Sequence, residues 1–162
     1  MRAKETEAIN VRRMTSGDLD AVLVLIGKIT KGKSRITYRD LIANYPGGLL
    51  DLSFVAESRG QILGFVLARA EFLYVPVVEV CLIQAIGVDP DHQGHSIGSA
   101  LVQKLVDQCR LDEVDTVRAL VAEDDEPLRR FIEHLGFGRS NIVNYDKTTY
   151  ALSHYTNHVP DE

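Results

Sequence analysis

The run Gln93-Gly94-His95-Ser96-Ile97-Gly98 joins a strand-like apolar segment to a segment with helical spacing, and its residue types suit the binding of an anion. The first turn of a helix has N–H groups without carbonyl partners, and the helix dipole favours negative charge there. Glycine lets the backbone approach a phosphate closely, glutamine adds a neutral donor, and serine is a common N-cap. The alternative is a plain strand–turn–helix junction. The dinucleotide pattern G-x-G-x-x-G and the phosphate loop ending in Gly-Lys-Ser/Thr are both missing.

A second candidate for chemistry is Glu79, which is the only carboxylate between Val75 and Val88. Partial burial between valines would tune this carboxylate for proton transfer, as a general base requires. The alternative is an exposed glutamate at a strand edge. Gln84 in the same segment can position a substrate or a water molecule, but it cannot act as a base.

Hydrophobic spacing predicts the elements that carry these residues as one mixed α/β domain. Apolar residues at every second position favour strands, and apolar residues three and four positions apart favour helices. Arg59-Gly60 between two apolar runs predicts a β-hairpin, and the long run at 77–88 predicts a central strand. The predicted strands are 9–14, 52–58, 61–72, 77–88, 114–122 and one or two closing strands within 138–155; the predicted helices are 19–29, 38–44, 97–109 and one between Asp125 and Gly136.

The segment from Val88 to Gly98 resembles the acyl-CoA-binding motif of the GNAT superfamily of N-acetyltransferases. That motif has Arg or Gln, two residues, Gly, one residue, and Gly or Ala. Gln93 and Gly98 match its ends, whereas Ser96 stands at the middle glycine. In that family the amides of the turn hold the pyrophosphate of coenzyme A, and the end of the preceding strand pairs with the pantetheine arm.

A second segment, from Asp125 to Phe137, is similar to the family helix Asn-x-x-Ala-x-x-Phe-Tyr-x-x-x-Gly-Phe. The matching residues are Phe131, Gly136 and Phe137; the departures are Asp125 for Asn, Leu128 for Ala and Ile132 for Tyr. The resemblance extends over roughly residues 10–150, and the two motifs together are more specific than either alone.

The resemblance implies a mostly antiparallel, twisted central sheet flanked by helices, with strands splayed at the acyl-CoA site. It implies an N-acetyltransferase that moves an acetyl group from acetyl-CoA to an amine by direct attack on the thioester. The oxyanion donor would be a backbone N–H near Val88. Arg130 either reaches the 3′-phosphate or belongs, with Arg129, to a solvated helix face. The implied contacts to acetyl-CoA are Ile86, Gly87, Val88, Gln93, Gly94, His95, Ser96, Ile97, Gly98, Ser99, Asp125 and Arg130.

The tyrosine that the family commonly uses as general acid falls at Ile132, which cannot donate a proton. Three alternatives follow. Tyr145 can substitute for it, the thiolate can leave unassisted, or the protein is a regulatory module that binds acyl-CoA with lost or weak transferase activity. The acceptor is an amine on a small molecule or a protein, bounded by residues 28–48 and 138–150. The basic loop Lys31-Gly32-Lys33-Ser34-Arg35 either attracts an acidic substrate or is ordinary surface.

Composition favours a soluble cytoplasmic domain spanning the 162 residues, with residues 1–8 as a loose leader. The net charge of −5 disfavours a nucleic-acid partner, and the absence of a run of 18 apolar residues disfavours a membrane span. Cys81 and Cys109 are expected to be reduced core residues. No metal is expected, because the two His pairs, His92/His95 and His154/His158, lack a third ligand. The apolar YVPVVEV segment could be the edge of a homodimer.

Overall fold

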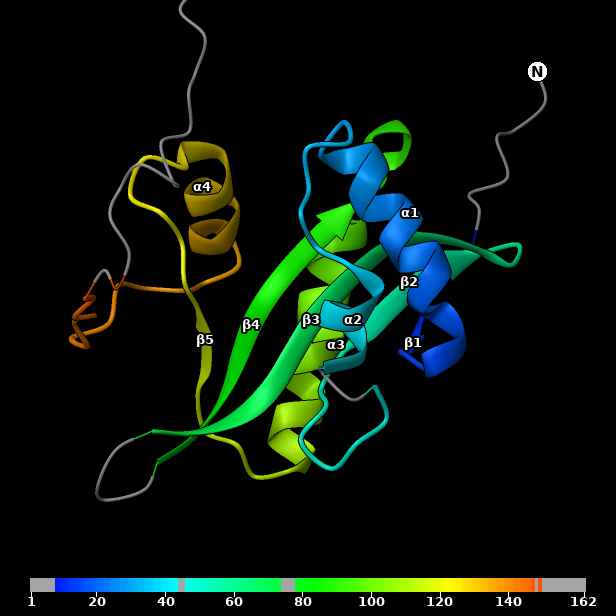
Figure 1. Cartoon of the computed structure of the whole chain (residues 1–162). Helices are drawn as coiled ribbons and strands as arrows, with labels where there is room; N and C mark the ends of the chain where they lie inside the picture. The colour runs from blue at the N-terminus through cyan, green and yellow to red at the C-terminus, as the bar shows by residue number, and fades with distance from the viewer. Residues whose placement is uncertain (1–7, 44–45, 74–77, 148, 150–162) are drawn as a thin grey trace, which may run out of the picture.

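A computed structural model describes residues 8–43, 46–73, 78–147 and 149, and these form one mixed α/β arrangement (Figure 1). Some sequence predictions lie outside the described residues. These are the leader up to residue 7, Asn44 at the end of the second predicted helix, most of the YVPVVEV segment, the pair His154/His158, and much of the closing strands.

The observed elements follow the predicted order as far as α4. The strands are β1 (Asn10–Arg13), β2 (Phe54–Ser58), β3 (Gln61–Leu73), β4 (Val78–Val88) and β5 (Val117–Ala119); the helices are α1 (Leu19–Ile29), α2 (Tyr38–Ala43), α3 (Ile97–Leu111) and α4 (Glu126–His134); the short 3₁₀ turns are η1 (Ser16–Asp18) and η2 (Pro90–His92).

The five strands form one sheet in the order β1-β2-β3-β4-β5. Neighbours from β1 to β4 are antiparallel, whereas β4 and β5 are parallel. Arg59 and Gly60 form the two-residue turn between β2 and β3 with φ angles of 50° and 77°, as a type I′ hairpin requires. The predicted hairpin and the predicted mixed, mostly antiparallel fold are confirmed.

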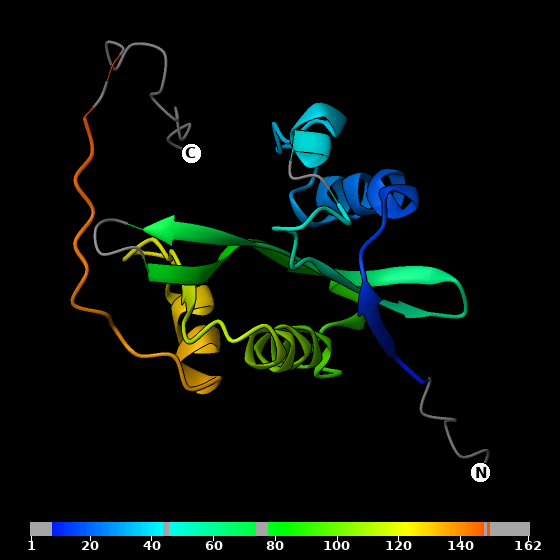
Figure 2. The ribbon, with the colours of Figure 1, turned by 90° about the horizontal axis from the view of Figure 1, so that it is seen from below.

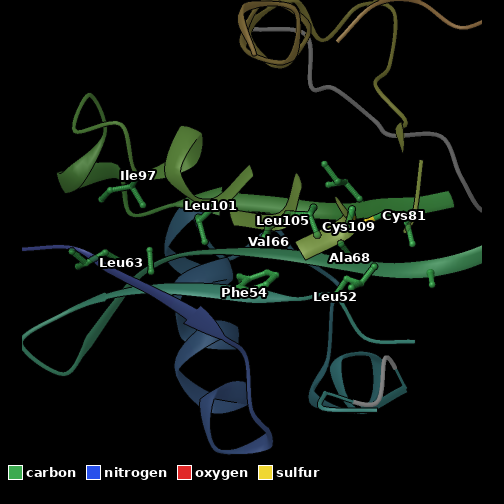
Figure 3. Packing of buried hydrophobic residues seen from close by; sticks show 14 residues of the cluster. Leu52, Phe54, Leu63, Val66, Ala68, Cys81, Ile97, Leu101, Leu105 and Cys109 are labelled. Carbon is green, nitrogen blue, oxygen red and sulfur yellow. The ribbon is translucent and has the colours of Figure 1, made fainter. Parts of the chain in front are cut away.

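Helices cover both faces of the sheet. Figure 2 shows α1 and α2 on one face and α3 and α4 on the other. Side chains alternate between the faces along each strand, so two hydrophobic clusters form, one beneath α3 and one beneath α1. Cys81 of β4 and Cys109 of α3 are buried free thiols in the α3 cluster, as expected for core residues (Figure 3).

A capping box starts the 3₁₀ turn η1, which leads directly into α1. Asp18 accepts hydrogen bonds from the Thr15 N–H at 2.8 Å and from its hydroxyl at 3.0 Å. Arg12 of β1 donates two more, at 2.8 and 2.9 Å. The Arg12 guanidinium is the main reason that the pKa of Asp18 is lowered to about 2. One carboxylate therefore ties the first strand to the first helix.

The strand predicted at 114–122 forms but is shorter than predicted, because only Val117–Ala119 pair with β4. The closing strands predicted within 138–155 are absent from residues 138–147 and 149, and the rest of that range lies outside the described residues. The described side chains of this last segment are exposed from Arg139 onward, Tyr145 to 94%. A strand face is stabilised by burial, and this polar stretch, which contains Asn144 and Asp146, buries neither face. In the described ranges 8–43, 46–73 and 78–147, no helix is long and apolar enough to cross a membrane.

Candidate functional site

A break in the pairing of β4 creates an open edge in the sheet. β5 pairs with β4 only from Cys81 to Ile83. On its other side, β4 has Ile83 opposite Ala68 and Ala85 opposite Leu67, so Gln84 is the extra residue of a β-bulge. Beyond Gln84, β4 continues to Val88 with β3 on one side and, among the described residues, no strand on the other.

The bulge decides which backbone groups face the open edge. Before it, the Cys81 N–H points toward β5 and donates to the Thr116 carbonyl at 2.9 Å. After it, the Asp89 N–H points toward β3 and donates to the Leu63 carbonyl at 2.7 Å. Because direction alternates along a strand, the N–H and C=O groups of Ile86 and Val88 face the open edge.

Gly87 lies between Ile86 and Val88, and its N–H and C=O groups point toward β3 rather than toward the open edge. Its backbone belongs to the β3 side, where it is paired with Phe65. A Cβ on Gly87 would lie 2.7 Å from Cδ1 of Ile29 and 2.8 Å from Cε1 of Phe65. The missing side chain therefore lets the last turn of α1 pack directly behind the open edge.

The turn after β4 leads into a helix whose first N–H groups bond to no other group that the structure describes. Gly94 and Ser96 have φ angles of 84° and 59°, and α3 begins at Ile97. The first N–H bonded within the helix is that of Ala100, which donates to the Ser96 carbonyl at 2.9 Å, and the Ser96 side chain makes no capping bond. Among the described residues, the N–H groups from Gln93 to Ser99 have no acceptor. This arrangement can hold an anion such as a pyrophosphate.

An ion-pair cluster holds this turn against α1. Lys28 donates to Asp89 and to Asp91, both at 2.7 Å. Asp89 is only 2% exposed and also accepts the Asp91 N–H at 2.9 Å. The Lys28 ammonium is the main cause that holds the pKa of Asp89 below its ordinary value. Sequence reasoning missed Lys28, because a lysine in the last turn of a helix is common and 61 residues separate it from Asp89.

The side chains of the turn mostly face outward. Gln93, Gly94, His95 and Ser96 are exposed, and His95 Nδ1 lies 3.0 Å from the His92 carbonyl. Their exposure leaves them accessible to a ligand at the free N–H groups.

Gly98 connects the two sequence motifs. A Cβ there would lie 3.0 Å from Cζ of Phe131 in α4, so the missing side chain makes room for the aromatic ring. Asp125 caps α4 by accepting the Leu128 N–H at 3.2 Å, and Arg130 pairs with Glu126 on an exposed face of the helix. Asp125 thus performs the capping role that an asparagine would also fill.

The structure does not bring the predicted catalytic side chains to the open edge. Glu79 is exposed and lies seven residues before Ile86, about 23 Å along the strand at ~3.3 Å per residue. Tyr145 is 94% exposed in the segment without strands, and Ile132 is buried in α4. The segment from Gln84 to Val88 carries no ionisable side chain.

Two cavities lie away from the open edge. One of about 460 Å³ includes Arg13, Asp51 and Glu79. The other, of about 1150 Å³, lies between α3, β5, α4 and the segment after α4. Neither of these two cavities is lined by a residue from 84 to 99.

Comparison with known proteins gives consistent results. Residues 27–137 match the acetyltransferase (GNAT) family. The chain is 28% identical over 144 residues to an uncharacterised N-acetyltransferase of Methanocaldococcus jannaschii, covering 82% of this chain and 62% of that protein. It is 36% identical over 93 residues to a mycothiol acetyltransferase of Thermobispora bispora, covering 55% of this chain and 30% of that protein.

The chain therefore spans less than two thirds of the length of these two relatives. A solved aminoglycoside N-acetyltransferase in complex with CoA has the same fold, with a TM-score of 0.75 at 16% identity, covering 91% of this chain and 99% of that one.

Proposed function

Because the chain belongs to the GNAT acetyltransferase family, we propose that it transfers the acetyl group of acetyl-CoA to an amine by direct attack on the thioester. The observation that supports this most strongly is the combination of two features on adjacent segments. One is the open edge of β4, and the other is the turn with free N–H groups at the start of α3.

The pyrophosphate of coenzyme A would lie on the turn. The N–H groups from Gln93 to Ser99 supply donors, and the dipole of the 15-residue helix α3 supplies favourable potential. The exposed side chains of Gln93 and His95 lie where they can add contacts to phosphate oxygens. Arg130 would need to exchange its pairing with Glu126 for the 3′-phosphate.

The pantetheine arm would extend along the open edge as a strand does. Its two amide groups can pair with the outward N–H and C=O groups of Ile86 and Val88. Gly87 contributes by letting α1 approach rather than by contacting the ligand. The thioester then lies near the bulge, so we place the oxyanion donor at the backbone of Gln84, upstream of the position near Val88 that the sequence suggested.

In the reaction, the amine nitrogen attacks the thioester carbonyl, the C–N bond forms, the C–S bond breaks, and the nitrogen gives one proton to a water molecule. A thiol with a pKa of about 8.5 is a good leaving group, so we propose that the thiolate leaves without a protein acid. Ile132 and Tyr145 then need no role. Glu79 would take part only if the acceptor site extended to the end of β4 where Glu79 lies. We assign the positioning of the acceptor or of a water molecule to Gln84.

The experiment that tests this proposal is a thermal-shift titration with acetyl-CoA on the wild type and two variants of Ser96. Ser96→Asp places a carboxylate at the free N–H groups, whereas Ser96→Asn is its neutral match and also tolerates the left-handed conformation. Acetyl-CoA at ~100 times its Kd should stabilise by about 2.7 kcal/mol, a shift of roughly 5–10 °C at this size.

We expect the shift to persist in Ser96→Asn and to disappear in Ser96→Asp, while the ligand-free melting temperature of Ser96→Asp equals or exceeds that of the wild type. Turnover with a panel of amines, followed by release of the free thiol, then separates a transferase from a module that only binds acyl-CoA. A wild-type protein that shows no shift with saturating acetyl-CoA refutes the proposal.

A further inference from the structure

Three cations next to the site have no partner in the described part of the chain. Lys31, Lys33 and Arg35 are exposed, and the charged group of each makes no hydrogen bond or ion pair with any residue that the structure describes. The protein as a whole carries a charge of −5. In contrast, Arg12 and Lys28 are each held by two carboxylates. The helix dipole accounts for Lys28 in the last turn of α1, but it does not account for three more cations beyond the helix.

These cations lie beside the open edge. Just before the loop, Lys28 binds Asp89, and the side chain of Ile29 lies against Gly87. The loop therefore starts where the backbone of β4 is exposed, and Figure 1 shows it leaving α1 near the carboxyl end of β4 and crossing toward α2. It lies on the face of the sheet opposite α3 and α4 (Figure 2).

The loop is ordered by its own hydrogen bonds. The Gly32 N–H donates to the Gly27 carbonyl at 2.8 Å, and the Lys33 N–H to the Thr30 carbonyl at 3.0 Å. The Thr30 hydroxyl donates to the Ile26 carbonyl at 2.8 Å and accepts from the Ser34 N–H at 3.2 Å. The positive charges are thus presented on a structured segment, which lowers the entropy lost when a ligand binds.

Exposed apolar side chains continue the same surface. Ile36, Tyr38 and Ile42 follow the basic loop along the chain into α2, and all three are exposed. Asp40 is the only acid in the sequence from 31 to 43, and it is used as a cap for α2, where it accepts from the Thr37 N–H at 2.7 Å. A ligand that fits this surface carries negative charge followed by an apolar group.

We propose that the acceptor is the N-terminal α-amine of a peptide or protein whose next residues are acidic; this rests on the proposed transferase function. From Lys31 to Arg35 the chain spans at most ~14 Å, which an extended peptide of four or five residues matches. A polycationic amine is disfavoured, because it would place like charges against the loop.

The chemistry of the open edge points to the same acceptor. The segment from Gln84 to Val88 has no ionisable side chain to take a proton from the attacking amine. An α-amine has a pKa of about 7.7–8.0, so a useful fraction is already neutral near pH 7.5, whereas a lysine amine at about 10.4 is almost fully protonated. A site without an adjacent base therefore selects an α-amine.

The test uses the full chain with acetyl-CoA and three hexapeptides that share the same N-terminal serine. Their second to fourth residues are acidic, amide-bearing (Asn/Gln) or arginine, so that each peptide has one amine. A fourth peptide is acidic with a blocked N-terminus and one internal lysine. Release of coenzyme A thiol and the mass of the product give kcat/KM.

We expect kcat/KM for the acidic peptide to exceed that for the amide peptide by roughly tenfold, since three exposed ion pairs act together. The arginine peptide and the lysine-amine peptide should be poorer still. Screening in 1 M NaCl, where the Debye length is ~3 Å, should reduce the preference to about twofold.

Charge-reversal variants locate the effect. Lys33→Glu should remove most of the acidic preference and raise the KM for the acidic peptide, with an unchanged Kd for acetyl-CoA. Lys104→Glu on α3 is the matched control, because it changes the net charge equally at an exposed site away from the loop. The Lys104→Glu variant should prefer the acidic peptide over the amide peptide to the same extent as the wild type.

The outcomes separate the two proposals. Acetylation of all peptides at similar rates, or a Lys33→Glu variant that loses acetyl-CoA affinity instead of peptide preference, overturns the acceptor proposal and leaves the transferase function standing. Binding of acetyl-CoA without acetylation of any peptide also overturns the acceptor proposal. Failure to bind acetyl-CoA at all overturns the proposed function itself.

Discussion

The substitution Gly87→Ala tests the arrangement of the open edge more directly than any change at an exposed residue. Gly87 follows the bulge at Gln84, and only the register after that bulge directs its missing side chain toward α1. An added methyl group would lie 2.7 Å from Cδ1 of Ile29 and 2.8 and 2.9 Å from Cε1 and Cζ of Phe65. Carbon atoms in good contact are about 3.5–4.0 Å apart, so one or both neighbours must move.

The expected cost follows from how freely each neighbour can move. Cδ1 of Ile29 is the end of a flexible side chain, whereas Phe65 is 3% exposed and packed within the α1 cluster. Overpacking of this kind costs ~1–3 kcal/mol, and the lower chain entropy of alanine in the unfolded state returns up to ~1 kcal/mol. We therefore expect a net loss of about 1–2 kcal/mol, or roughly 2–8 °C in melting temperature.

Thermal or urea denaturation of four proteins makes the measurement: the wild type, Gly87→Ala, Ile29→Val and the double variant. Ile29→Val removes the clashing Cδ1 atom, so the double variant should recover part of the loss, with a coupling of at least ~0.5 kcal/mol. The matched control is Gly27→Ala in α1, where an added Cβ meets no atom within 4 Å. That change should stabilise the protein by ~0.5–1 kcal/mol through helix propensity.

A Gly87→Ala variant as stable as the wild type, or one whose loss is independent of Ile29→Val, would refute the reasoning. Either result would mean that β4 has no bulge at Gln84. In that case, the backbone groups of Ile86 and Val88 would face β3 rather than the open edge, and the proposed pantetheine contacts would be lost as well.

Three further predictions concern the elements that support the site. Asp18→Asn should lower the free energy of unfolding by roughly 1–2 kcal/mol at pH 7. The lowered pKa of Asp18 contributes stability above pH 3.8, the ordinary pKa of the group, and this stability is lost as the pH falls toward about 2. The difference between the variant and the wild type should therefore vanish in acid melts. A variant as stable at pH 7 as the wild type would show that the Arg12 contact contributes nothing. Lys28→Met leaves Asp89 buried without its cation, so it should lower the melting temperature and weaken coenzyme A binding. The control Lys104→Met should change neither quantity. Equal effects of the two substitutions would show that the ion pair of Lys28 and Asp89 does not support the site. Gly98→Ala brings a Cβ to 3.0 Å from the facing aromatic ring of α4, and calorimetry should show a small loss of stability, below that of Gly87→Ala.

Local sequence determined most of the elements and the family. α1 was predicted at its observed bounds, because capping residues precede an apolar periodic run. The hairpin at Arg59-Gly60 followed from turn chemistry, and the turn from Gln93 to Gly98 followed from glycine spacing before a periodic helix. Each of these features depends on residues within one or two turns of each other, so the sequence contains the information directly.

The tertiary structure alone decided how the site is arranged. The register of a strand depends on its neighbours, and the bulge at Gln84 appears only when β4 is paired with β3. The short pairing with β5 sets where the sheet opens, which leaves Glu79 far from that opening. The closing strands also failed to appear in the described residues, because their alternation has no buried face to pack against.

The same holds for the contacts that support the turn. Gly98 matches a ligand-binding motif in the sequence, but its side-chain position faces Phe131, which is 33 residues later in the chain. The Lys28–Asp89 pair joins residues 61 positions apart. Local propensity fixes φ, ψ and the periodicity of burial, whereas contacts between distant residues form only when packing brings the elements together, and the site of this protein is built from such contacts.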